Sequence, residues 1–223
     1  MATRSDHDKL RLLPFKQYVG VNQHDPLRFY YWPLIGPIYR HRVELCLAEC
    51  LGGDSVLEIG FGAGLSFLNL HAKYKMIYGL DLTASAKDIE ASFRERQIET
   101  RLQNGTVLSM PYEDNSFDTV LLISILEHLK PDLQSRAFHE ICRVLKPGGQ
   151  VVYGVPVERP LMVTAFRLMG VNIREHHFST EADVFRAASA HMTKINLVQM
   201  RSQLIPSLGP IYEVGHFQKK EMQ

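Results

Sequence analysis

Short apolar runs alternate with amphipathic stretches through the middle of the chain. The apolar runs predict strands at Val56–Ile59, Met76–Leu80, Ile98–Leu102, Phe117–Ile123 and Gln150–Val155. The amphipathic stretches between them predict helices at Leu65–Ala72, Ala84–Arg96 and Leu133–Leu145. Parallel neighbours need a crossover connection, and a helix usually supplies it. The pattern therefore predicts an α/β fold with a doubly wound, mostly parallel sheet and helices on both faces.

The two ends of the chain have a different pattern. Residues 1–39 show no clean period and carry four prolines, which indicates a helical or irregular N-terminal cap. A helix is expected at Arg40–Leu51, ended by the following glycine pair. After Pro156 we expect helices Pro160–Met169 and Thr180–Ser189, then a C-terminal antiparallel hairpin of Ile195–Met200 and Ile211–Phe217. The expected organisation is a cap or lid segment, 1–39, and one domain, 40–223, whose core motifs occupy 53–156.

Composition excludes several classes of protein. With 25 Lys+Arg against 24 Asp+Glu, the formal charge of +1 creates no global field that would attract nucleic acid or an acidic membrane. No apolar run approaches the ~20 residues of a spanning helix. Three cysteines cannot all pair, and Cys46 and Cys50 lack further nearby ligands, so we expect no zinc site and a reducing, cytoplasmic location. Nothing in the sequence specifies an oligomeric state.

A glycine-rich turn follows the first predicted strand. Gly60, Gly62 and Gly64 would let a ligand approach bare backbone at the carboxyl end of that strand. The spacing is G-x-G-x-G and lacks the later glycine of the dinucleotide pattern, and no Gly-Lys-Ser/Thr follows as in a phosphate-binding loop. A carboxylate at Glu58 would repel a pyrophosphate and favour a ligand ammonium group. These features indicate a nucleotide-like ligand other than NAD.

An acidic residue ends the second predicted strand. Asp81 stands 21 residues after Gly60, where its carboxylate can accept hydrogen bonds from both hydroxyls of a ribose. Its alternative role is to cap the helix that follows. Together with the glycine turn, Asp81 favours an adenosine-containing ligand.

Five motifs in order then carry a resemblance to a known family. They are Leu57-Glu58-Ile59-Gly60-x-Gly62-x-Gly64, Asp81, Met110-Pro111-Tyr112-x-x-Asn115-Ser116-Phe117-Asp118, Glu127-His128-Leu129 and Leu145-Lys146-Pro147-Gly148-Gly149. Over residues 53–156 the chain resembles the class I S-adenosylmethionine-dependent methyltransferases, specifically the ubiquinone-biosynthesis-like small-molecule group with a type 11 methyltransferase domain.

The resemblance implies a seven-stranded Rossmann-like fold with S-adenosylmethionine as cofactor and S-adenosylhomocysteine as product. It places the methionine part over Gly60–Gly64, the ribose on Asp81, and the adenine between Leu82 and the loop Gly105–Val107. The residues expected to bind the cofactor are Glu58, Gly60, Phe61, Gly62, Gly64, Asp81, Leu82, Thr106, Val107, Ile123 and Tyr30. Relatives usually carry an acidic residue at the position of Thr106. A hydroxyl is a weaker acceptor, so the hydrogen bond to the adenine is expected to be weaker by about 1 kcal/mol.

A sulfonium already activates its methyl group, so the protein has mainly to place a nucleophile in line and exclude water. A general base helps when the acceptor carries a proton, and the candidates are His128, His176 and His177. His128 has the alternative role of hydrogen-bonding the start of its helix, and His176 and His177 that of a solvated turn. Tyr30, in the aromatic cluster of residues 29–32, can cover the sulfonium or serve as core for a docking helix.

The sequence lacks two elements that are typical of particular methyl acceptors, and this narrows the class of acceptor. It has neither the Asn/Asp-Pro-Pro-aromatic element of amino-group methylases of adenine or glutamine nor the clustered acidic residues of a magnesium-dependent catechol enzyme. We therefore expect a small, partly apolar metabolite as acceptor, no nucleic acid and no metal. The apolar helix predicted at Leu161–Met169 can line the acceptor pocket, touch a lipid surface peripherally, or pack on the sheet. Two alternatives stay open: a non-catalytic cofactor-binding scaffold or partner subunit, and an NAD-dependent oxidoreductase.

Overall fold

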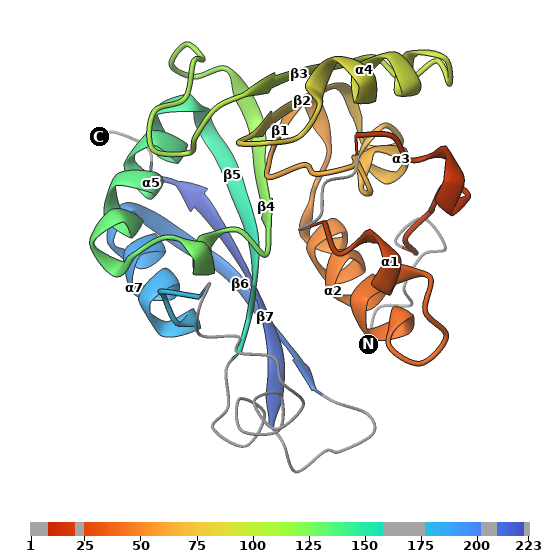
Figure 1. The fold of residues 1–223 in the computed structure, drawn as a ribbon. Helices are drawn as coiled ribbons and strands as arrows, with labels where there is room; N and C mark the ends of the chain where they lie inside the picture. Colours follow the sequence, from red (N-terminus) through yellow and green to blue (C-terminus); the bar gives the residue numbers. More distant parts are fainter. Residues whose placement is uncertain (1–8, 21–24, 158–176, 202–208, 221–223) are drawn as a thin grey trace.

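The computed structural model describes residues 9–20, 25–157, 177–201 and 209–220. Seven strands form one sheet in the order β3-β2-β1-β4-β5-β7-β6 (Figure 1). Strands β1 to β5 pair in parallel, whereas β7 pairs antiparallel with both β5 and β6. The bounds are β1 Gly53–Ile59, β2 Tyr74–Asp81, β3 Thr100–Asn104, β4 Phe117–Ile123, β5 Leu145–Pro156, β6 Met192–Arg201 and β7 Pro210–Lys219. The predicted mostly parallel sheet with a C-terminal antiparallel pair is confirmed.

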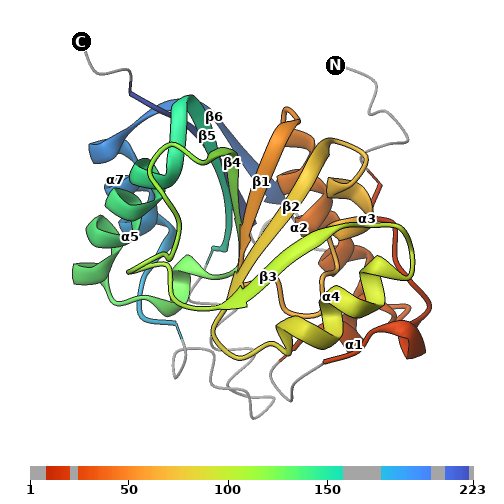
Figure 2. The ribbon, with the colours of Figure 1, turned by 90° about the horizontal axis from the view of Figure 1, so that it is seen from above.

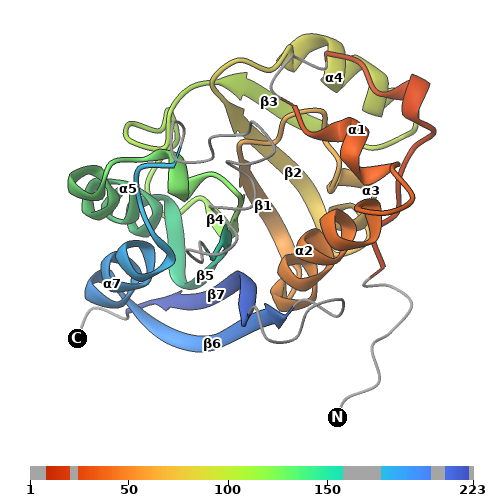
Figure 3. The same cartoon turned by 60° about the horizontal axis from the view of Figure 1, so that its bottom comes forward.

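Helices cover both faces of the sheet (Figures 2 and 3). One face carries α1 (Leu27–Tyr30), α2 (Gly36–Glu49), α3 (Phe67–Leu70) and α4 (Ala86–Arg94), and the other carries α5 (Pro131–Val144) and α7 (Glu181–His191). Neighbouring strand residues alternate between two cores: Leu121 packs with α2 residues, whereas Val120 and Leu122 pack with α5 residues. This burial on both faces explains why the strands read as continuous apolar runs.

Several element bounds differ from the prediction. Helix α2 begins at Gly36, four residues earlier than expected, because Pro37 is tolerated in the first helical turn. Helix α3 has only four residues, and β3 begins at Thr100 instead of Ile98. Strand β5 begins at Leu145, where its first residue already pairs with β4. The predicted helix Pro160–Met169 lies outside the described residues.

The described part of the N-terminal segment includes the short 3₁₀ helix η2 (Phe15–Gln17) and α1. Its first residues are attached to α2 and α3 by hydrogen bonds: the amide of Leu10 donates to Glu44 at 3.0 Å, and that of Arg11 donates to Asn69 at 2.9 Å. The segment thereby reaches the same face as α2 to α4. Among the described residues, no helix is long and apolar enough to cross a bilayer.

Candidate cofactor and acceptor site

The glycine turn, residues 60–64, leaves β1 at the carboxyl edge of the sheet. The amide of Gly60 donates to the carbonyl of Leu80 at 2.7 Å, which ties the turn to the end of β2. Gly60 has φ +75°, and a Cβ added there would lie 2.0 Å from Cδ1 of Ile125. Ile125 belongs to the connection that follows β4, so this connection rests directly on the turn. Glycine is required here by both the backbone angle and the space.

The two carboxylate oxygens of Asp81 accept hydrogen bonds from two different stretches of backbone. Its Oδ2 accepts from the amide of Gly62 at 3.0 Å, and its Oδ1 accepts from the amides of Thr83 and Ala84 at 2.9 Å each. The capping role considered from the sequence is thus present, and the ribose-binding role stays a prediction. One oxygen fixes the entry to α4, and the other faces the glycine turn, where a ribose would compete for it.

Glu58 lies beneath the turn and is 5% exposed. Ser66 hydrogen-bonds its carboxyl group. Burial raises the pKa of Glu58 to about 8, and the nearby charge of Asp81 adds to the rise. The sequence predicted a charged carboxylate at this position. Burial instead favours the protonated acid at neutral pH, because taking a charge out of water is costly.

Replacing Glu58 by glutamine is expected to change how stability depends on pH. The unfolded carboxyl releases its proton near pH 4.5 and the folded one near pH 8, so the folded state holds the extra proton between these values. The stabilisation is complete below pH 4.5 and is lost as the pH rises to about 8. Wild type should lose about 3.5 kcal/mol more than Glu58→Gln between about pH 5 and pH 8 in urea unfolding. A constant difference across that range would contradict the shifted pKa.

The residues expected around the adenine lie at the edge of β2 and β3. Leu82 is 73% exposed, whereas Val107 is buried. The hydroxyl of Thr106 accepts from the amide of Leu108 at 3.3 Å. The Thr106 hydroxyl therefore already accepts one hydrogen bond within its own loop. This contact would make it a still weaker acceptor for an adenine.

Three other predicted residues have their positions explained by packing. The side chain of Phe61 is buried and lies against Gly79 of β2, so only its backbone faces the turn. Ile123 is half-buried at the end of β4. Tyr30 is 5% exposed in α1 and makes an edge contact with Tyr39 at 5.5 Å between centroids. The aromatic cap residue therefore belongs to the core between α1 and α2.

His128 and His177 come together beside the end of β4. His128 ends the 3₁₀ helix η3 (Leu126–His128), and its ring lies 5.2 Å from that of His177. The segment of His177 is held there because the amide of Phe178 donates to the carbonyl of Glu127 at 2.8 Å. The two histidines proposed from separate stretches of sequence thus form one pair. His176 lies outside the described residues.

Glu127 joins this pair. One ligand atom from each of Glu127, His128 and His177 lies within 4.8 Å of the others, the one such group of three among the described residues. The set suits proton transfer, because imidazole and carboxylate groups can both accept and donate protons. The same types of ligand also accept zinc or manganese. Both histidines were singled out from the sequence, whereas Glu127 stood there only as part of the motif Glu127-His128-Leu129, with no role assigned to it.

Two charged residues of the N-terminal part were missed altogether. Asp25, just before α1, accepts from the amide of Ala63 in the glycine turn at 3.1 Å. Arg42 of α2 stacks on the ring of Tyr39 at 4.0 Å and lies 5.2 Å from that of Tyr212. The Nε atom of Arg42 is buried and has no hydrogen-bond partner within the described ranges. Neither residue belongs to a motif, and Asp25 reaches the glycine turn only through the tertiary fold.

A separate hollow of about 290 Å³ lies at the opposite edge of the sheet, lined by Asp118 and Lys146 among others. Asp118 accepts from Lys146 at 2.7 Å and from the amides of Asp54 and Ser55. These contacts join the starts of β1, β4 and β5. The acidic residue of the Asn115–Asp118 motif is therefore structural, and the candidate site is at the other edge.

Comparison with known proteins agrees with this geometry. Residues 57–153 match the model of a methyltransferase domain family. The chain is 35% identical over 105 residues to an uncharacterized methyltransferase, YcgJ, of Bacillus subtilis, covering 46% of this chain and 41% of that protein. It is 30% identical over 119 residues to a ubiquinone biosynthesis O-methyltransferase of Alkalilimnicola ehrlichii, covering 51% of this chain and 47% of that protein. The chain thus spans less than half the length of these curated relatives.

A solved structure extends the likeness over most of the chain. The N-methyltransferase NodS from Bradyrhizobium japonicum, in complex with S-adenosyl-l-homocysteine, has a TM-score of 0.67 at 20% identity. The match covers 92% of this chain and 97% of that one, and at this identity it is a likeness of fold. Residues 57–153 therefore match a methyltransferase domain, and the chain has the fold of an N-methyltransferase solved with S-adenosyl-l-homocysteine.

Proposed function

We propose that this protein binds S-adenosylmethionine at the glycine turn and transfers its methyl group to an oxygen, nitrogen or carbon of a small metabolite. The observation that carries the proposal is the position of Asp81, whose Oδ2 lies on the amide of Gly62. A carboxylate there lies between the end of β2, where the ribose would bind, and the turn that would hold the amino-acid end of the cofactor. The named activity of the quinone O-methyltransferase relative supports an oxygen acceptor.

The bound cofactor supplies an activated methyl group on sulfur. The protein contributes binding at the turn, in-line placement of the acceptor and exclusion of water, and no metal is part of this proposal. We propose His128 and His177 as the groups that take a proton from the acceptor, supported by their pairing at the end of β4. His176 stays a candidate for the same task. We also propose that the acceptor is partly apolar. The free thiols of Cys46, Cys50 and Cys142 are in keeping with a cytoplasmic location, which is the last part of the proposal.

Asp81→Ala and His128→Ala should separate binding from chemistry. Asp81→Ala is expected to weaken S-adenosylmethionine binding by about tenfold or more, because it removes the acceptor for the ribose. His128→Ala should keep the affinity within about twofold and lower the rate of S-adenosylhomocysteine formation by about a hundredfold. Calorimetric titration and a product assay across a panel of hydroxylated metabolites measure the two effects. An unchanged affinity in Asp81→Ala would remove that residue from the site.

The same assays test the two alternatives. Tight cofactor binding with no product from any acceptor would favour a non-catalytic scaffold or partner subunit. Tight binding of NADH in a fluorescence titration would favour an oxidoreductase. The spacing of Gly60, Gly62 and Gly64 is evidence against the latter.

A further inference from the structure

We propose that Asp25, from the N-terminal segment, is a cofactor-binding residue that accepts hydrogen bonds from the ammonium group of the cofactor's amino-acid end. The inference rests on the proposed function and deepens it. It assigns one contact to a part of the chain outside the matched domain, which spans residues 57–153.

The position of Asp25 is the first argument. Its Oδ2 accepts from the amide of Ala63 at 3.1 Å, and the same oxygen lies 3.0 Å from the place where Gly62 would carry a Cβ. The carboxylate therefore touches the bare face of the glycine turn. That face is the one from which a ligand approaches the turn, since glycine leaves it without side chains.

The use of the two oxygens is the second argument. Oδ1 accepts from the amide of Leu27 at 2.9 Å and so orders the start of α1. This local role needs only one oxygen. Oδ2 reaches instead to a turn 38 residues away in sequence. A carboxylate oxygen has two lone pairs, so Oδ2 can accept from a ligand while it stays beside Ala63.

The charges around the turn are the third argument. Asp81 accepts from the amide of Gly62, directly before Ala63, so two carboxylates occupy successive amides. Burial raises the pKa of Asp25, and the charge of Asp81 adds to the rise. A cation placed beside Asp25 and Asp81 relieves the repulsion between these two carboxylates, and an ammonium group with three donors fits that need.

The proposal predicts a selective loss in Asp25→Asn. Asparagine keeps an oxygen for Leu27 and removes the charge, so the start of α1 is preserved. The variant should bind S-adenosylmethionine about tenfold more weakly than wild type. S-adenosylhomocysteine should lose affinity to a similar extent. 5′-Methylthioadenosine, which has the same nucleoside and a neutral thioether sulfur like that of S-adenosylhomocysteine but no amino-acid end, should bind within about twofold of wild type. Asp81→Asn is the matched control and should weaken all three ligands, because all carry the ribose.

Calorimetric titration of the three ligands decides the outcome. An equal loss for all three ligands in Asp25→Asn would assign Asp25 to shaping the turn only, and an unchanged or tighter affinity for S-adenosylmethionine would overturn the proposal. If Asp25→Asn does not fold, Asp25→Ser, whose hydroxyl still accepts from Leu27, takes its place in the same titrations. Wild type that binds none of the three ligands would contradict the proposed function itself.

Discussion

Gly60→Ala should lower the free energy of unfolding by about 3 kcal/mol and weaken cofactor binding by about tenfold or more. The backbone angle, φ +75°, costs a residue with a Cβ roughly 1 kcal/mol. The added methyl would also lie 2.0 Å from Cδ1 and 2.5 Å from Cγ1 of Ile125. Forcing an extra carbon into a packed site typically costs about 1–3 kcal/mol more. The turn must then shift, and with it the amides that face the ligand.

Gly148→Ala is the matched control. Gly148 has nearly the same angle, φ +72°, but the nearest atom to its added Cβ is Nε2 of Gln218 at 3.9 Å. Only the backbone cost of about 1 kcal/mol should appear there, with binding unchanged. Denaturant unfolding and S-adenosylmethionine titration of both variants measure the contrast. Equal losses of stability at the two positions would show that Ile125 yields without cost.

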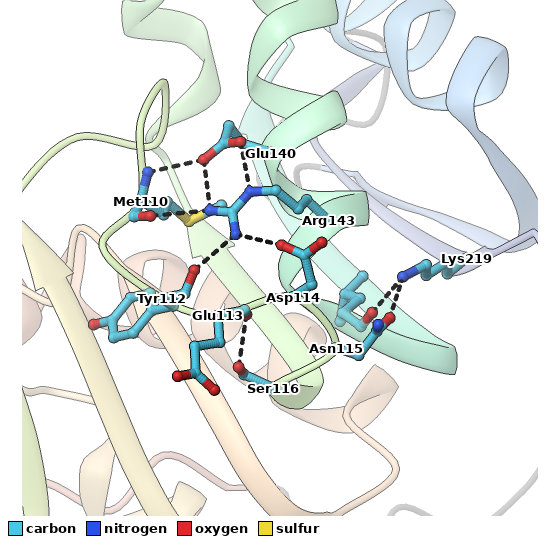
Figure 4. A network of polar contacts seen from close by, with 10 residues as sticks. Met110, Tyr112, Glu113, Asp114, Asn115, Ser116, Glu140, Arg143 and Lys219 are labelled. Atoms are coloured by element: carbon cyan, nitrogen blue, oxygen red, sulfur yellow. Dashed lines mark hydrogen bonds and ion pairs between the residues drawn. The ribbon is translucent and has the colours of Figure 1, made fainter.

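Arg143→Met should lower the free energy of unfolding by about 3 kcal/mol. Arg143 of α5 joins the loop between β3 and β4 to its own helix (Figure 4). It donates to the carbonyls of Met110 and Tyr112 at 2.9 and 2.7 Å, to Glu140 through two nitrogens, and to Asp114 at 2.9 Å. The side chains of Arg143 and Glu140 are 26% and 15% exposed, so Glu140 is only partly available to water, whereas Asp114 is 68% exposed.

Most of the loss of stability in Arg143→Met comes from the hydrogen-bond acceptors that the substitution leaves without their donor. Hydrogen bonds from Arg143 lower the pKa of Glu140 to about 2, and the amide of Met110 donates to the same carboxylate at 2.9 Å. Arg143→Lys keeps one charge without the planar fork and should recover about half of the stability. Chemical denaturation of the three proteins gives the comparison. A loss below about 0.5 kcal/mol in Arg143→Met would mean that water replaces the network.

The parts of the site that lie in consecutive residues could be predicted from the sequence. The glycine turn follows an apolar strand, and Asp81 ends the next one, so both were placed by local pattern and by the rule that parallel strands end at one edge. The helix and strand order follows for the same reason. The predicted bounds of elements were wrong where contacts with neighbouring elements determine them, as at the start of α2 and of β5.

Contacts between distant residues left no such pattern. Asp25 reaches Ala63 only after α1 has packed on α2, and nothing around it repeats or matches a motif. The raised pKa of Glu58 depends on burial by the surrounding fold, whereas the sequence showed only its place on the strand. His128 and His177 could each be suspected alone. Their pairing depends on the backbone bond from Phe178 to Glu127.

The position of β7 has a consequence for the margin of the sheet. β6 comes before β7 in the chain, yet its one neighbour in the sheet is β7, which lies between β6 and β5. A chain without residues 210–219 would leave β6 without a backbone partner and one side of β5 open. Loss of this single strand would therefore expose unpaired strand edges, which favour edge-to-edge association.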